Sequence, residues 1–110
     1  MGMLRRLKQD ERGLLVALIA GEPKANDLLA SLGDAIVEEM EDGGMGGLLF
    51  YRPDDRPRRL GKKLVEKEFV DIDGVPVMVA VNLDDHGELY ELDIWKVDFS
   101  PLKRFPPVIK

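Results

Sequence analysis

Residues 64–102 decide the fold, and they read LVEKEFVDIDGVPVMVAVNLDDHGELYELDIWKVDFSPL. Within them, Asp73-Gly74 lies between the β-forming residues Ile72 and Val75. This dipeptide favours a two-residue type I′ hairpin turn, because both central residues of such a turn need a positive φ. The sequence therefore predicts a hairpin with these pairs: Ile72 with Val75, Val70 with Val77, and Phe69 with Met78.

The strand after this turn has an apolar residue at every second position. The stripe consists of Val75, Val77, Val79, Val81 and Leu83. Alternation of this kind places one face of a strand in the core. The second turn is expected at 84–87, with a loop of two residues (His86-Gly87) or four. Either loop puts Tyr90, Leu92 and Ile94 beside the stripe, whereas a β-bulge would reverse the assignment of faces.

The opposite face of these strands mixes aromatic, apolar and acidic residues. It should hold Lys67, Phe69, Met78, Ala80, Asn82, Glu91, Asp93, Trp95 and Val97. In one interpretation, Phe69, Met78 and Trp95 form a second small cluster under the C-terminal tail. In the other, the face is a partly exposed patch that binds a partner, since Trp and Met are enriched at interfaces.

The rest of the chain predicts two helices and two further strands. The helices are expected at Asp10–Ala20 and Pro23–Leu32, and the strands at Ala35–Met40 and Gly47–Tyr51. Asp42-Gly43-Gly44 should form a turn, residues 52–59 a loop, and residues 99–110 an extended tail whose Phe99 and Leu102 anchor it. Asp98 should accept hydrogen bonds from the backbone or Ser100 as the last strand ends.

These elements define an α+β fold. Two N-terminal helices should pack on one face of an antiparallel sheet of about five strands, mostly a meander. The helices occupy about 10–32, the sheet about 35–98 and the tail 99–110, all within one domain of 110 residues.

Composition limits the function classes. The chain has no cysteine, which excludes disulfides, thiolate zinc sites and cysteine nucleophiles. It has no apolar run of about 18 residues, so we expect a cytoplasmic protein without a membrane span. The net charge is −5, which makes nucleic acid an unfavourable partner and favours a basic protein as the partner, if there is one.

Motifs for metals, phosphates and catalysis are incomplete. The run Gly43–Gly47 lacks the Lys-Ser/Thr of a P-loop, and Asp71-x-Asp73-Gly74 lacks the spacing of an EF-hand. His86, in Asp84-Asp85-His86, is the single histidine, and the chain has no threonine and only two serines, Ser31 and Ser100. We therefore expect no metal, no cofactor and no assigned catalytic residue.

Two segments resemble a small bacterial single-domain family of unknown function. They are the D-G-G-M-G turn at residues 42–46 and the E-L-D-x-W-K-x-D-F-S-P-L ending at residues 91–102. The similarity covers most of the chain, from Arg5 to Phe105, and implies no catalytic residue. The ending is also similar to that of some immunity-type proteins that neutralise toxins.

Two function hypotheses follow. The first is a non-catalytic binding module that binds a basic partner, with an immunity-like protein as one form of it. Its candidate residues are Trp95, Phe69, Met78, Glu88, Glu91 and Asp93. The alternative is a small enzyme or ligand-binding domain that uses Glu91 and Asp93 beside Trp95, in a cleft between the sheet and the tail. A flat or convex face would favour the first hypothesis and a concave pocket the second.

Overall fold

The structure is a computed structural model that describes residues 3–40, 46–51 and 59–106. Its helices are α1 (Gln9–Ile19), α2 (Ala25–Ser31) and the short 3-10 helix η1 (Leu32–Asp34). Its strands are β1 (Leu4–Arg6), β2 (Ile36–Glu39), β3 (Leu48–Phe50), β4 (Leu60–Val70), β5 (Pro76–Asp84) and β6 (Leu89–Lys96). The predicted turn at residues 42–44 and most of the predicted loop at 52–59 lie outside the described residues.

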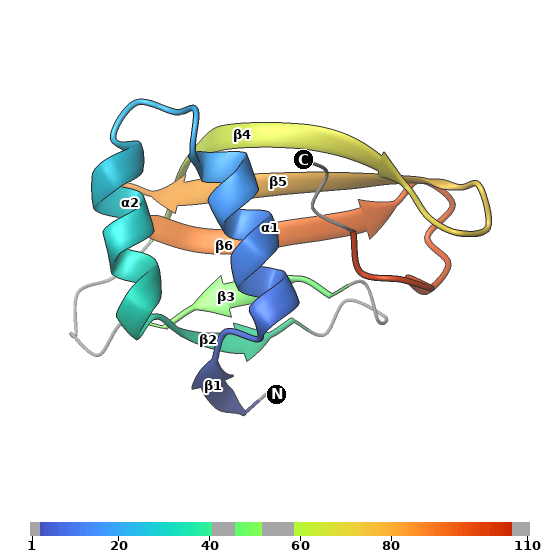
Figure 1. The fold of residues 1–110 in the computed structure, drawn as a ribbon, viewed down its shortest axis with the longest axis horizontal. Coiled ribbons are helices and arrows are strands. Elements are labelled where there is room, and N and C mark those ends of the chain that lie inside the picture. The colour runs from blue at the N-terminus through green and yellow to red at the C-terminus, as the bar shows by residue number, and fades with distance from the viewer. Residues whose placement is uncertain (1–2, 41–45, 52–58, 107–110) are drawn as a thin grey trace.

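The strands form one antiparallel sheet in the order β1-β2-β3-β6-β5-β4, and α1 and α2 cover one of its faces (Figure 1). The α+β class and the two helices on one face are therefore confirmed. The described sheet has six strands, not about five. No helix in the described part of the chain is long and apolar enough to span a membrane.

The additional strand is β1, which pairs with β2 at the edge of the sheet. Three residues are too few to show a period in the sequence. Arg5, the central residue of β1, holds this strand in place. Its guanidinium forms two hydrogen bonds of 2.8 Å with the Glu11 carboxylate on α1 and an ion pair of 3.0 Å with Glu39 on β2. Glu11 also accepts the backbone N–H of Lys8 at the start of α1, so one carboxylate joins a strand to a helix.

The core lies between the helices and the sheet, as the valine stripe predicts. Val77, Val79, Val81, Leu92 and Ile94 are all buried. The register pairs Val79 with Ile94 and Val81 with Leu92, so these side chains share a face. They pack with the buried leucines and isoleucine of the helices, which are Leu14, Leu15, Leu18, Ile19 and Leu28.

The first hairpin has a different turn from the one predicted. Asp71 and Val75 close it through the Asp71 N–H, which donates to the Val75 carbonyl. The Gly74 N–H donates to the Asp71 carbonyl, and Gly74 has a φ of 83°. The loop therefore has three residues, a type I turn followed by a glycine bulge, in place of the two-residue type I′ turn.

This extra residue shifts the register of β4 by one position. Phe69 pairs with Val77 and Val70 with Pro76, so the predicted pairs Phe69–Met78 and Val70–Val77 are wrong. A shift of one residue moves every side chain of a strand to the other face. Phe69 accordingly packs against the core on the helix-covered side, and the placement of Lys67 on the opposite face is wrong as well.

The second turn also has three residues, with Gly87 at a φ of 82°. The Asp84 N–H donates to the Glu88 carbonyl, and the Asp84 carboxylate accepts the N–H groups of His86 and Glu88 at 2.8 and 3.0 Å. Leu83 pairs with Leu89, and an irregularity between Asn82 and Leu83 then places Asn82 opposite Glu91. Leu92 and Ile94 consequently join the core as predicted, whereas Tyr90 lies at the irregularity and is half-buried.

The C-terminal segment 97–106 folds back onto the helix-covered side. Leu102 and Phe105 pack against the core, and the Lys103 N–H donates to the Asp71 carboxylate at 2.7 Å. The prediction that Leu102 anchors the tail is confirmed, but Phe99 is 78% exposed, and Phe105 supplies the aromatic contact with the core. Asp98 accepts both the N–H and the hydroxyl of Ser100, as predicted.

Candidate functional site

The candidate site lies on the face of the sheet opposite α1 and α2, which we call the second face. The β5–β6 register places Met78 beside Trp95, Ala80 beside Asp93, and Asn82 beside Glu91. The Asn82 amide donates to the Glu91 carboxylate at 2.8 Å, which fixes both side chains. Met78 and Trp95 are half-buried, so part of each side chain remains in contact with solvent.

Apolar residues continue this surface toward the end of the sheet that carries the first hairpin. Val70 pairs with Pro76, and the Val97 N–H donates to the Pro76 carbonyl, so the three residues lie side by side. Val70 is 57% exposed and Val97 is 49% exposed. Together with Met78 and Trp95 they form an apolar patch on the second face.

Acidic residues share the second face with this patch. Among the residues that the structure describes, the strand register assigns five carboxylates to the second face: Glu38, Glu66, Glu68, Glu91 and Asp93. The cationic side chains that it assigns there are Arg6 and Lys63. Lys63 pairs with Glu66 at 3.0 Å, which neutralises both charges locally. Among the described residues of this face, carboxylates therefore outnumber cationic side chains.

Four of the six candidate residues share this face, namely Trp95, Met78, Glu91 and Asp93. Phe69 does not, because the three-residue turn places it on the helix-covered side. Glu88 does not either, since it belongs to the β5–β6 turn and lines a cavity beneath α2.

The part of the tail that the structure describes, up to residue 106, does not cover Trp95. Its Leu102 and Phe105 contact the core on the helix-covered side, whereas Trp95 lies on the second face. The predicted cluster of Phe69, Met78 and Trp95 under the tail is therefore wrong. The described residues up to 106 likewise form no cleft between the tail and the carboxylates of Glu91 and Asp93, which the alternative hypothesis placed there.

On the helix-covered side, Lys96 is fully buried at the end of β6. Its ammonium lies 2.9 Å from the Asp71 carboxylate and 2.7 Å from that of Asp73, and it also donates to the Pro101 carbonyl at 3.4 Å. Asp71 is itself buried and accepts the N–H groups of Ile72 and Lys103. This cluster joins the first hairpin, the last strand and the tail.

Charge pairing shifts the pKa values in this cluster. Burial alone would raise the pKa of Asp71, but the Lys103 N–H, the Lys96 ammonium and the Ile72 N–H outweigh it and lower the pKa to about 2. The hydrogen bond from Lys96 likewise lowers the pKa of Asp73. Burial lowers the pKa of Lys96, yet its bonds to Asp73 and Asp71 are stronger and raise it above the ordinary value.

Lys96 was not among the residues predicted from the sequence to matter, although its position in the strand indicates a buried site. Lys96 continues the series Leu92, Ile94 at the same two-residue period, so it belongs to the core face. A lysine on that face needs an anionic partner, and the Asp-x-Asp of the first turn is at the adjacent strand end. The Asp71-x-Asp73-Gly74 segment therefore holds an ammonium group. No group of residues arranged to hold a metal ion is found in the described ranges.

Comparison with protein families matches residues 4–106 to a domain of unknown function, DUF6984. The chain belongs to this family, because the match spans nearly its whole length. The resemblance to a small family of unknown function is thus confirmed. Neither a curated protein nor a solved structure matched the chain.

Proposed function

We propose that the protein is a non-catalytic binding module that takes up a basic protein partner on the second face of its sheet. The observation that carries this proposal is the pairing of Met78 with Trp95 on a face that neither α1 nor α2 covers. Val70 and Val97 extend the apolar area, and Glu68 and Asp93 lie beside it.

This combination suits a protein surface with cationic and apolar groups. Tryptophan side chains at the centre of an interface often dominate its binding energy. Negative potential around such an anchor accelerates association with a positively charged partner and disfavours acidic ones. A basic toxin has a surface of this kind, so the proposed function includes that of an immunity-like protein that binds such a toxin.

The proposal can be tested by selecting a phage-displayed library of random peptides against the immobilised protein. We expect the selected peptides to be rich in Lys, Arg and apolar residues. Binding of the purified peptides to Trp95→Ala should weaken by roughly 30-fold or more, which corresponds to a hot spot of about 2 kcal/mol. Melting of the variant establishes that it is folded.

A pair of charge reversals distinguishes binding at the second face from a general effect of the protein's net charge. Glu68→Lys changes the second face, and Asp10→Lys makes the same change of charge on α1, at an exposed position outside both candidate sites. Glu68→Lys should slow association markedly, and Asp10→Lys should have a smaller effect. Selected peptides that are not basic, or that bind Trp95→Ala and Glu68→Lys as tightly as the parent protein, would contradict the proposal.

A further inference from the structure

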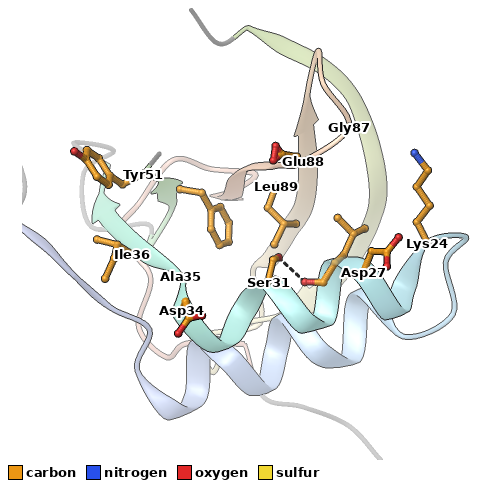
Figure 2. A pocket seen from close by; sticks show the side chains of 12 residues that line it. Lys24, Asp27, Ser31, Asp34, Ala35, Ile36, Tyr51, Gly87, Glu88 and Leu89 are labelled. Atoms are coloured by element: carbon orange, nitrogen blue, oxygen red, sulfur yellow. Dashed lines mark hydrogen bonds between the residues drawn. The ribbon is translucent and has the colours of Figure 1, made fainter. Parts of the chain in front are cut away.

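A cavity of about 750 Å³ lies on the other side of the molecule, between α2 and the β5–β6 turn (Figure 2). Its volume falls in the range of roughly 300–1,000 Å³ that is usual for small-molecule sites. The lining comes from four parts of the fold, which are α2 with η1, β2, the end of β3, and the β5–β6 turn with the start of β6.

The deepest lining residues of this cavity are apolar. Leu28, Phe50 and Leu89 line it, and each is at most 6% exposed because each also belongs to the hydrophobic core. In Figure 2, Leu89 points from β6 toward Ser31 on α2. A ligand in this position would place an apolar or aromatic body against the end of the core, which favours binding through burial of apolar surface.

The rim of the cavity offers hydrogen-bond acceptors and negative charge. Asp27 and Ser31 are four residues apart on α2, so they lie on one side of that helix, and Asp34 follows on η1. The Ser31 hydroxyl donates its hydrogen to the Leu28 carbonyl at 2.7 Å, which leaves its oxygen to act as an acceptor. Glu88 lines the cavity from the β5–β6 turn.

The charges of the rim select the class of ligand. Three carboxylates, of Asp27, Asp34 and Glu88, line the cavity, with Lys24 as the one cationic side chain among its described lining residues. Neither Asp27 nor Asp34 is paired with a cation in the described part of the chain. An anionic ligand would meet a net negative rim, and a bare metal ion would gain nothing from the apolar lining.

We propose that this cavity binds a small organic cation, an amine or guanidine attached to an aromatic or branched aliphatic body. The body occupies the apolar lining formed by Leu28, Phe50 and Leu89. The cationic group lies at the rim, beside either Asp27 or Asp34, whose carboxylates stand at opposite ends of the α2–η1 segment in Figure 2. This site shares no residue with the apolar patch of the second face or with Glu68 and Asp93 beside it, so it and the proposed function can each fail without the other.

Three probes of one shape and different charge test the proposal: naphthylmethylamine, naphthylmethanol and naphthoate. Their binding is followed by amide chemical shifts in ¹⁵N-labelled protein and by calorimetry. We expect the amine to bind best, the alcohol more weakly and the carboxylate least, with shifts centred on residues 27–36 and 87–89. The amine that binds no better than the carboxylate, or shifts centred on Trp95, would overturn the proposal.

Conservative variants separate the two parts of the site. Asp27→Asn combined with Asp34→Asn should weaken the amine by roughly fivefold, as expected for the loss of one exposed ion pair at either end of the rim, and should leave the alcohol unchanged. Glu68→Gln, which removes the same kind of charge on the second face, should change neither. Ala35→Leu, which adds volume at the cavity wall, should weaken both probes. An amine affinity that survives the double Asn variant would overturn the assignment of the carboxylates.

Discussion

Lys96 is the residue whose replacement should destabilise the domain most. Lys96→Met keeps most of the side-chain volume but leaves Asp71 and Asp73 without their shared cation. Removal of one partner from a buried ion pair is strongly destabilising, because the other charge stays buried and uncompensated. We expect the melting temperature to fall by roughly ten degrees or more, as measured by circular dichroism.

Two further variants test the origin of that effect. Lys103→Met should change melting little, because Lys103 contributes its backbone N–H to Asp71 and its side chain is exposed. Adding Asp71→Asn to Lys96→Met should recover part of the loss, since no full charge then remains at the buried position. Equal melting of Lys96→Met and the parent protein would show that the cluster does not stabilise the fold.

Trp95 provides a spectroscopic test of how exposed the second face is. Its indole is half-buried, beside Met78, and the tail packs on the other side of the sheet. We expect an emission maximum between those of buried and fully exposed tryptophan, and measurable quenching by acrylamide. Because Trp95 is the single tryptophan, the signal has one source. A blue-shifted emission that acrylamide does not quench would contradict this placement.

Among the strands, β4 contains a position where only glycine fits. Gly61 lies at an irregularity of the β4–β5 pairing, between Leu60 and Lys62. A Cβ atom at this position would clash with the Asp84 carbonyl oxygen. Gly61→Ala should therefore lower the free energy of unfolding by roughly 1–3 kcal/mol, as overpacking does, in a urea titration.

Gly33→Ala is the matched control for this prediction. Gly33 is exposed on η1, and a Cβ there would meet nothing within 4 Å. We expect a change within about 0.5 kcal/mol, as at most surface positions. Equal effects of the two substitutions would mean that the close contact at Gly61 does not constrain β4.

The tail contains a second matched pair, Phe99 and Phe105. Phe105 packs against the core, whereas Phe99 is 78% exposed and has a φ of 60°. Phe105→Ala should lower the melting temperature by several degrees, because it removes a partly buried aromatic ring. Phe99→Gly should leave it unchanged or raise it slightly, since glycine adopts a positive φ without strain. A larger loss for Phe99→Gly than for Phe105→Ala would reverse the assignment of the anchor.

The faces of the strands could be predicted from the sequence for β5 and β6 but not for β4. The valine stripe correctly predicted the core faces of β5 and β6. The alternation is read along the strand itself, so an error of one residue in the position of a strand end does not change it. It could not fix the face of β4, since Asp-Gly suits both a type I′ turn and a type I turn with a glycine bulge. Only the longer turn brings Asp71 and Asp73 together around Lys96, and these two contacts span 25 and 23 residues in sequence. The cavity beneath α2 was not predictable either, because it depends on how α2 packs against β3 and β6.

For the whole molecule, the ion pairs predict how stability varies with pH. The pKa of Asp71 is lowered from 3.8 to about 2, and those of Asp73, Asp98 and Glu11 are also lowered. A carboxyl group whose pKa is lower in the folded state stabilises the fold above its unfolded pKa and loses that contribution as the pH falls toward the folded value. The domain should therefore lose stability between about pH 5 and pH 2.

The cationic partners act at the opposite end of the pH range. The pKa values of Lys96 and Arg5 are raised, so their contributions are complete below the ordinary value of 10.5 for lysine and are lost only in more alkaline solution. We expect unfolding free energies from urea titrations to be nearly constant between about pH 5 and pH 9 and to decline steeply in acid. Asp71→Asn should be less stable at neutral pH yet decline less between pH 5 and pH 2, because the carboxyl group whose pKa is lowered to about 2 is gone. An acid decline as steep in Asp71→Asn as in the parent protein would show that the Lys96 cluster does not set the acid limit of this fold.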